Sequence, residues 1–326
     1  MKPDEPTQAP RAVVRCVNGH EWPPGTKFCG ICGTRIEAIV GETSTFIMGA
    51  GVLGGEALLR YWGWVLGGKI PRSPEPLESM AIIDTSAQEV AKLSEAASLI
   101  GGQGLPTPSL RILSGRSEDT RRIWRSGELA AREDTALSEF LLEAGAKGAR
   151  SLMLVGLLGD GAMSGAGPYI LDTLANQGVS CTKVVLCAIP SDDEPNLTHF
   201  NAYCGLSRLL RFKNRRNADF IVLLNERHVQ ENRETDADGQ ELGLVETLAY
   251  ILSILTNPGS RDSPRWLAVS ESPAMGRLAG AIHAVPCLAL NRSVRVFDSL
   301  AALLESAIVQ PLAKVDMGNV IFAPTY

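Results

Sequence analysis

The sequence of 326 residues has no long uninterrupted apolar run, no excess of positive charge and no apolar segment at its start. Glu56 and Arg60 interrupt the most hydrophobic stretch, which falls short of the roughly 18 apolar residues that suggest a membrane-spanning helix. The opening MKPDEPTQAP lacks the apolar core of a secretory signal. A formal net charge of −5 offers no broad basic face for a phosphate backbone. We therefore expect a soluble, cytoplasmic protein without a transmembrane segment or a nucleic acid partner.

Cysteine is scarce, and its seven residues divide into two groups. Those at 181, 187, 204 and 287 are scattered in apolar or helical surroundings, as ordinary buried thiols are. The others cluster with a histidine in CVNGHEWPPGTKFCGICG, where a Pro-Gly turn separates two pairs of ligands. Two such pairs suit a closed, tetrahedral, structural zinc site, whereas free thiols in a tail would leave the spacing unexplained. The predicted Zn²⁺ ligands are Cys16, His20, Cys29 and Cys32.

The organisation of the chain follows from alternating apolar and helical stretches. From Thr43 onward this alternation predicts an α/β fold with a parallel sheet and helices on both of its faces. We expect helices over about 56–65, 127–144 and 240–255 among others. The predicted domains are a disordered tail over 1–13, a zinc ribbon over 14–37, a nucleotide-binding domain over 43–258 and a short C-terminal domain over 259–326.

Two glycine-rich turns each connect an expected strand to an expected helix. The first, GAGVLGG at 49–55, matches the GxGxxG pattern of dinucleotide folds, which by itself is weak. The second, GDGAMSGAG at 159–167, follows the apolar run SLMLVGLL. Glycines let main-chain N–H groups approach an anion, and the following helix presents its positive end. Because a dinucleotide fold needs one such turn, the pair predicts a pyrophosphate or triphosphate held from two sides.

Several stretches between residues 44 and 258 resemble motifs of the tubulin and FtsZ superfamily, in the same order. GDGAMSG is similar to the phosphate loop of that family, GGGTG(T/S)G, and GAGVLGGEA to its first glycine turn. MAIIDTSAQEV is similar to the FtsZ stretch IAVNTDAQ. FNAYCGLSRLLRFKNRRNADFIVLLNERHV resembles the tubulin run that contains YNA and LSxxxL. The ordered set is far more specific than any one motif.

The resemblance implies a Rossmann-type domain that binds GTP or GDP, with Mg²⁺ as a companion cation, and self-associates into filaments or oligomers. Ser164 would supply a hydroxyl to the phosphates, and the Asn225 amide would pair with guanine. Glu241 would accept from the guanine edge, or else is a solvated charge at a helix start. The predicted nucleotide contacts are Gly49, Ala50, Gly51, Gly54, Gly55, Asp84, Gly159, Gly161, Ala162, Met163, Ser164, Gly165, Asn225 and Glu241.

Departures from the family pattern bear on hydrolysis. Ala162 and Met163 stand where the phosphate loop of relatives has threonine and glycine, which removes a hydroxyl and adds bulk. Relatives hydrolyse GTP between subunits with an acidic loop, for which NPGSRDSPRW supplies Asp262 as the candidate catalytic residue; the alternative is an ordinary turn aspartate.

Three classes of function therefore stay open. The first is a slow polymerising GTPase or a nucleotide-dependent cytoskeletal switch, with an unknown protein partner bound through the zinc ribbon. The second is a non-hydrolysing nucleotide-binding or interaction scaffold of the same fold. The third is an NAD-dependent oxidoreductase, for which His199 and His228 are available, but nothing positions a hydride acceptor.

Overall fold

The computed structural model describes residues 14–15, 21–22, 31, 45–69, 79–101, 108–113, 123–149, 151–179, 181–212, 217–236, 239–256, 283–284, 286, 302 and 311–313. The chain divides into two compact units, Met1–Thr43 and Ser44–Tyr326. In the first unit, β1 (Val14–Arg15) and β2 (Glu21–Trp22) pair antiparallel, with Arg15 opposite Glu21. The predicted zinc ligands lie outside the described residues, so the zinc site stays a prediction.

The second unit is built on one parallel sheet. Its described strands are β3 (Thr45–Ala50), β4 (Ser79–Asp84), β5 (Ser109–Ile112), β6 (Ser151–Leu157), β7 (Thr182–Ile189), β8 (Phe220–Asn225) and β9 (His283–Ala284). They lie in the order β5-β4-β3-β6-β7-β8-β9, and all neighbours are parallel. The central strands are nearly continuous apolar runs because both of their faces are covered. The direction of strand succession reverses between β3 and β6.

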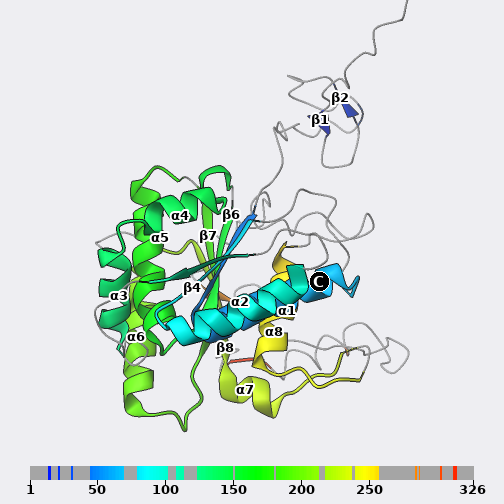
Figure 1. The fold of residues 1–326 in the computed structure, drawn as a ribbon. Coiled ribbons are helices and arrows are strands. Elements are labelled where there is room, and N and C mark those ends of the chain that lie inside the picture. Colours follow the sequence, from blue (N-terminus) through cyan, green and yellow to red (C-terminus); the bar gives the residue numbers. More distant parts are fainter. Residues whose placement is uncertain are drawn as a thin grey trace, which may run out of the picture. The chain divides into compact units, whose positions relative to one another are not determined.

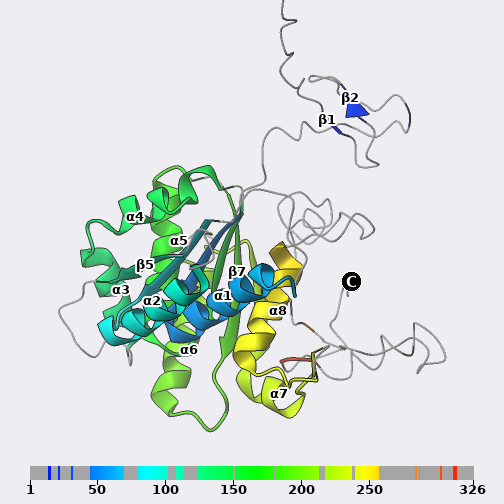
Figure 2. The same cartoon turned by 45° about the vertical axis from the view of Figure 1, so that its right-hand side comes forward.

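Helices cover both faces of the sheet (Figures 1 and 2). One face carries α1 (Gly51–Leu66), α2 (Ala87–Gly101), α7 (Glu226–Glu231) and α8 (Leu244–Thr256). The other carries α3 (Trp124–Glu133), α4 (Leu137–Glu143), α5 (Gly167–Asn176) and α6 (Asn196–Leu210). Each face has its own apolar core, one including Trp62 and Leu252 and the other Phe46 and Leu171. The predicted α/β fold with helices on both faces is confirmed.

Three predicted helix boundaries are wrong for identifiable reasons. The expected helix over 127–144 is two helices, because Asp134 has an extended backbone and its carboxylate accepts from the Ala136 N–H at 3.2 Å. The helix expected to start at Glu56 starts at Gly51, directly after β3. The helix expected from Gln240 starts at Leu244, because the residues before it pair back across an isolated bridge, Thr235 to Glu241.

Few residues of the predicted C-terminal domain are described. β9 extends the sheet beyond β8, and the Asn225 N–H donates to the Leu312 carbonyl at 2.6 Å. Asp262 lies outside the described residues. Among the helices that the structure describes, none has the length and hydrophobicity to cross a membrane.

Candidate functional site

The two glycine-rich turns meet at one edge of the sheet, at the carboxyl ends of β3 and β6. These strands are adjacent and parallel, and the strand order reverses between them. In open α/β sheets, ligands bind in the crevice at such a reversal. A Cβ added to Gly51 would lie 3.7 Å from the Ala162 Cβ and would overlap the Asp160 carboxylate. The turns therefore face each other, as the sequence predicts.

Most glycines of the first turn serve the packing of α1 on the sheet. A Cβ on Gly49 would lie 2.6 Å from the Gly54 carbonyl oxygen, and one on Gly54 would overlap the Val155 carbonyl oxygen. A Cβ on Gly55 would press on Leu93 and Ile82. Gly51 differs, since its φ of 75° lies in the left-handed region that favours glycine and it faces the second turn. Among the described glycines of the first turn that are predicted to contact phosphate, only Gly51 is placed so that an added Cβ would point at the second turn.

The second turn is clamped between α3 and α6. Residues Ala162–Ala166 form a π-helix that continues into α5. A Cβ on Gly165 would overlap the carbonyl of Trp124 in α3, and one on Gly205 of α6 would lie 2.8 Å from Ser164. The absence of a side chain at Gly165 therefore allows a close approach of α3. The contact of Gly165 with phosphate stays a prediction.

Ser164, predicted as a phosphate contact, has a partner within its own turn. Its side chain is fully buried, and its hydroxyl accepts from the Gly159 N–H at 2.7 Å. Asn201 of α6 completes the clamp, since its Nδ2 donates to the Gly159 carbonyl at 3.0 Å and its Oδ1 accepts from the Trp124 N–H at 3.2 Å. Sequence reasoning did not single out Asn201 as a site residue, although it is the asparagine of the FNA stretch.

Asp160 fills the space between the two turns. Its Oδ1 accepts from the Met163 N–H at 2.6 Å, and its main-chain carbonyl accepts from the Ser164 N–H at 3.2 Å. Burial, and to a smaller extent the nearby Asp84 carboxylate, raise the pKa of the Asp160 carboxyl to about 7, against the effect of the nearby main-chain N–H groups. Sequence reasoning missed Asp160; the available signal was an acid where relatives have glycine.

Asp84, at the end of β4, lies at the same edge. It is 2% exposed, and its Oδ1 accepts from the Ser86 N–H at 2.9 Å, which holds the turn into α2. Asp84 and Asp160 interact electrostatically, so this edge of the site carries two like charges when both carboxyls are ionised.

The predicted guanine contacts have other partners. Asn225 ends β8 as expected, but its Oδ1 accepts from the N–H groups of Arg227 at 2.9 Å and His228 at 3.3 Å, and so caps α7. In this arrangement the amide oxygen serves as the cap of α7, and pairing of Asn225 with guanine stays a prediction. Glu241 is largely exposed and pairs with Arg233 at 2.9 Å, as its alternative interpretation as a solvated charge implies.

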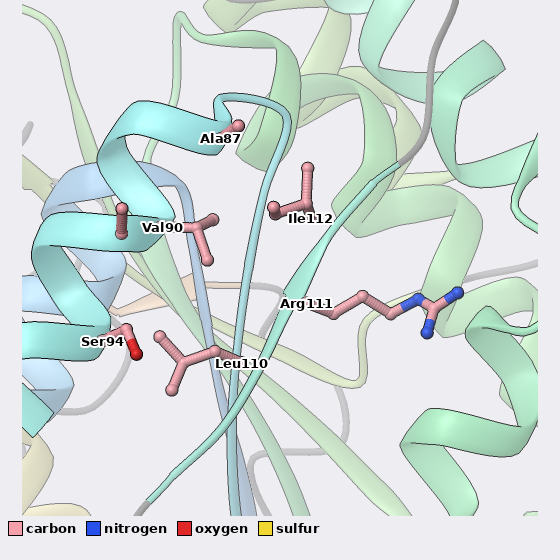
Figure 3. Close-up of a pocket in the computed structure, with 7 residues that line it drawn as sticks. Ala87, Val90, Ser94, Leu110, Arg111 and Ile112 are labelled. Atoms are coloured by element: carbon pink, nitrogen blue, oxygen red, sulfur yellow. The ribbon is translucent and has the colours of Figure 1, made fainter. Parts of the chain in front are cut away.

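A separate hollow of about 520 Å³ lies between α2 and the edge strand β5. Figure 3 shows Val90, Leu110 and Ile112 around it, with the Arg111 side chain extending away. Arg111 instead binds Asp134, with Nε to Oδ2 at 2.7 Å, and this partner raises the pKa of the guanidinium. The hollow is lined by residues of α2 and β5 and therefore does not explain the two glycine turns.

The site at β3 and β6 has the donors that a phosphate needs, but they are engaged. The Met163 N–H, at the start of the helix that continues into α5, donates to Asp160, and the Ser164 hydroxyl accepts from the Gly159 N–H. A nucleotide phosphate does not fit these donors while the Asp160 carboxylate occupies them. Within the described ranges, no group of three or more His, Cys, Asp or Glu side chains is placed to hold a metal ion.

Comparisons with known proteins give a fold. No protein-family model and no curated protein sequence matches the chain. Among solved structures, CetZ from Methanosaeta thermophila strain DSM 6194 is similar, with a TM-score of 0.59, 14% identity and coverage of 85% of this chain and 71% of that one. TubZ of the Clostridium botulinum phage c-st has a TM-score of 0.54 and 13% identity, with coverage of 83% and 76%. CetZ2 from Haloferax volcanii, in a GTPγS-bound protofilament, has a TM-score of 0.50 and 18% identity, with coverage of 75% and 65%.

Proposed function

Because the chain has a tubulin/FtsZ-like fold, we propose that it is a self-associating, guanine-nucleotide-binding protein that turns GTP over slowly or not at all. The observation that carries the proposal is the meeting of two helix N-termini, those of α1 and of the helix running from the π-turn into α5, at the reversal of strand order. Such an arrangement favours an anion by its main-chain donors and by both helix dipoles. The similar CetZ2 structure is a GTPγS-bound protofilament, which supports both nucleotide and assembly.

Weak turnover is proposed from the chemistry of the second turn. Ala162 has no hydroxyl, and the Ser164 hydroxyl already accepts a hydrogen bond from the Gly159 N–H. Asp160 adds a negative charge at the place where the charge of the phosphate would develop. Preorganised donors at that place are what stabilises a phosphoryl-transfer transition state. Any residual hydrolysis is assigned to Asp262, as the acid near Pro258 that a neighbouring subunit would supply.

The test uses the full-length purified protein with GTP and GDP. We expect sedimentation of assemblies that depends on which nucleotide is present, with phosphate release that is slow and rises with protein concentration. The Asp262→Ala variant should abolish the residual release but leave nucleotide binding unchanged. Release that is independent of protein concentration would remove the shared-site part of the proposal, and the absence of any guanine-nucleotide binding would remove the whole.

The contacts of Asp160 favour a second candidate, an interaction scaffold that assembles without nucleotide. A carboxylate that already satisfies the donors of the second turn lets the fold exist without a ligand. Assembly that is identical in GTP, GDP and nucleotide-free buffer would favour this scaffold. In either case, we propose that the unit Met1–Thr43 binds zinc and contacts a protein partner.

A further inference from the structure

We propose that Asp160 is a tethered anion that occupies the phosphate-binding donors of the second glycine turn and competes there with the phosphates of an incoming nucleotide. The inference rests on the proposed function and concerns the regulation of the same site. Asp160 would thereby control the affinity of the site for an anion.

The contacts of Asp160 are those expected of a bound anion. Its Oδ1 accepts from the Met163 N–H at 2.6 Å, which is a short distance for an N–H donor. The nearby main-chain N–H groups of Ala162 and Ser164 also favour its charged form, and the Ser164 N–H donates to the main-chain carbonyl of Asp160 at 3.2 Å. Met163 lies in the first turn of the helix that continues into α5, where a helix favours negative charge. A carboxylate held in this way takes the place of phosphate oxygens.

The carboxylate also blocks the approach from the first turn. Gly51 has the left-handed backbone that directs the chain from β3 into α1. The space that a Cβ on Gly51 would occupy is taken by Oδ2 of Asp160. One side chain therefore fills the gap between both glycine turns, and a phosphate held from two sides requires its departure.

Departure of the carboxylate is feasible because its position is electrostatically strained. Asp84 stands close enough to disfavour the charged form of Asp160, and burial disfavours it more strongly. Opposed to these effects are the main-chain donors, which a phosphate would satisfy equally well. Because these effects oppose each other, a phosphate can displace the Asp160 carboxylate, which otherwise occupies the donors of the second turn.

The experiment compares the full-length parent with Asp160→Ala, Asp160→Asn and a control. The control, Asp192→Ala, removes the same charge from an exposed aspartate in the segment after β7, whose side chain reaches Arg227 at 3.4 Å. The dissociation constants of pyrophosphate, GDP and GTP are measured by calorimetry, with and without Mg²⁺. Pyrophosphate reports on the donors alone, and the nucleotides report on the proposed function.

We expect Asp160→Ala to bind pyrophosphate and GDP on the order of ten-fold more tightly than the parent, since roughly one charge-assisted contact no longer has to be broken. Asp160→Asn should change affinity in the same direction, and it decides the question if the alanine variant does not fold. The control should stay within about two-fold of the parent.

Unchanged or weaker binding in the Asp160 variants would overturn the inference. If affinity is lost only in the presence of Mg²⁺, Asp160 is a cation ligand instead. The outcomes also separate the two proposals. If Asp160→Ala binds pyrophosphate more tightly than the parent but binds neither GTP nor GDP in preference to it, the competition by Asp160 is supported and the proposed nucleotide function fails. If the parent binds GTP and the Asp160 variants bind it equally, the nucleotide function is supported and the competition by Asp160 fails.

Discussion

Gly127 of α3 lies against the main-chain carbonyl of Gly161, so closely that a Cβ at position 127 would overlap the carbonyl oxygen. The contact joins a helix of one sheet face to the loop that begins the second glycine turn. Because the neighbour is backbone rather than the end of a flexible side chain, the turn itself must move if position 127 gains a side chain.

Gly127→Ala should therefore lower the free energy of unfolding by about 2–3 kcal/mol, the usual effect of overpacking a rigid interior. Gly63→Ala is the matched control, because Gly63 lies in α1 with nothing within 4 Å of an added Cβ. That variant should be neutral or stabilise by up to about 1 kcal/mol through helix propensity. Urea unfolding of both variants decides the matter, and equal midpoints would contradict the contact.

Asn201→Ala should destabilise the second turn. The substitution leaves the Trp124 N–H and the Gly159 carbonyl without the partners that bridge α3, α6 and the turn, at a position 1% exposed. Loss of one buried and one partly buried hydrogen bond is expected to lower the free energy of unfolding by about 2–3 kcal/mol.

The control is Asn232→Ala, which removes a single bond to the His228 carbonyl at a partly exposed site and should lower stability by less than about 1 kcal/mol. Hydrogen exchange of residues 159–166 should also accelerate in Asn201→Ala and stay unchanged in the control. Exchange that is the same in both variants would show that Asn201 does not hold the turn.

The layers and the meeting of the two turns were predictable because they follow from pattern alone. Apolar runs followed by glycine-rich turns predict parallel strands, and the carboxyl ends of such strands share an edge. What the glycines do was not predictable. Gly54 and Gly165 have the same local sequence signature as phosphate-loop glycines, but each serves a contact with a distant carbonyl, of Val155 and Trp124 respectively.

Partners across the fold determine contacts that the sequence alone does not reveal. The Ser164 hydroxyl and the Asn225 amide are of the right chemical type for a ligand, and no local pattern reveals that Gly159 and α7 already use them. Asp160 could have been noticed as an acid in a loop of glycines. Its direction toward Gly51 depends on the register of β3 with β6, in which Ala50 pairs with Gly156.

Asp160 should make the stability of the fold depend on pH. Its pKa is raised from 3.8 to about 7 in the folded protein. Between these values the folded state holds a proton that the unfolded state has lost, so this group's contribution to stability falls as pH rises from about 4 to about 7 and then levels off. Asp160→Asn cannot titrate, and its stability should gain on that of the parent over this range.

The measurement is the difference in thermal midpoint between Asp160→Asn and the parent from pH 5 to pH 8. A difference that grows up to about pH 7 and then stays constant is expected. The neighbouring Asp84 is present in both proteins, so most of its own titration cancels. A difference independent of pH would mean that the carboxyl has an ordinary pKa.

The purified full-length protein should contain about one zinc ion per chain, as a closed site with two ligand pairs requires. In the first unit, the antiparallel pairing of β1 and β2 places Arg15 opposite Glu21, so the connection between them begins with Cys16 and ends with His20.

Cys29→Ser removes a ligand from the other pair and should lower the zinc content to near zero, because a structural site loses most of its affinity when one of its four ligands is removed. Cys204→Ser, in α6, is the control and should retain the metal, since that thiol is free and belongs to the second unit. Zinc is measured by mass spectrometry after gel filtration, and a parent protein without zinc would refute the site.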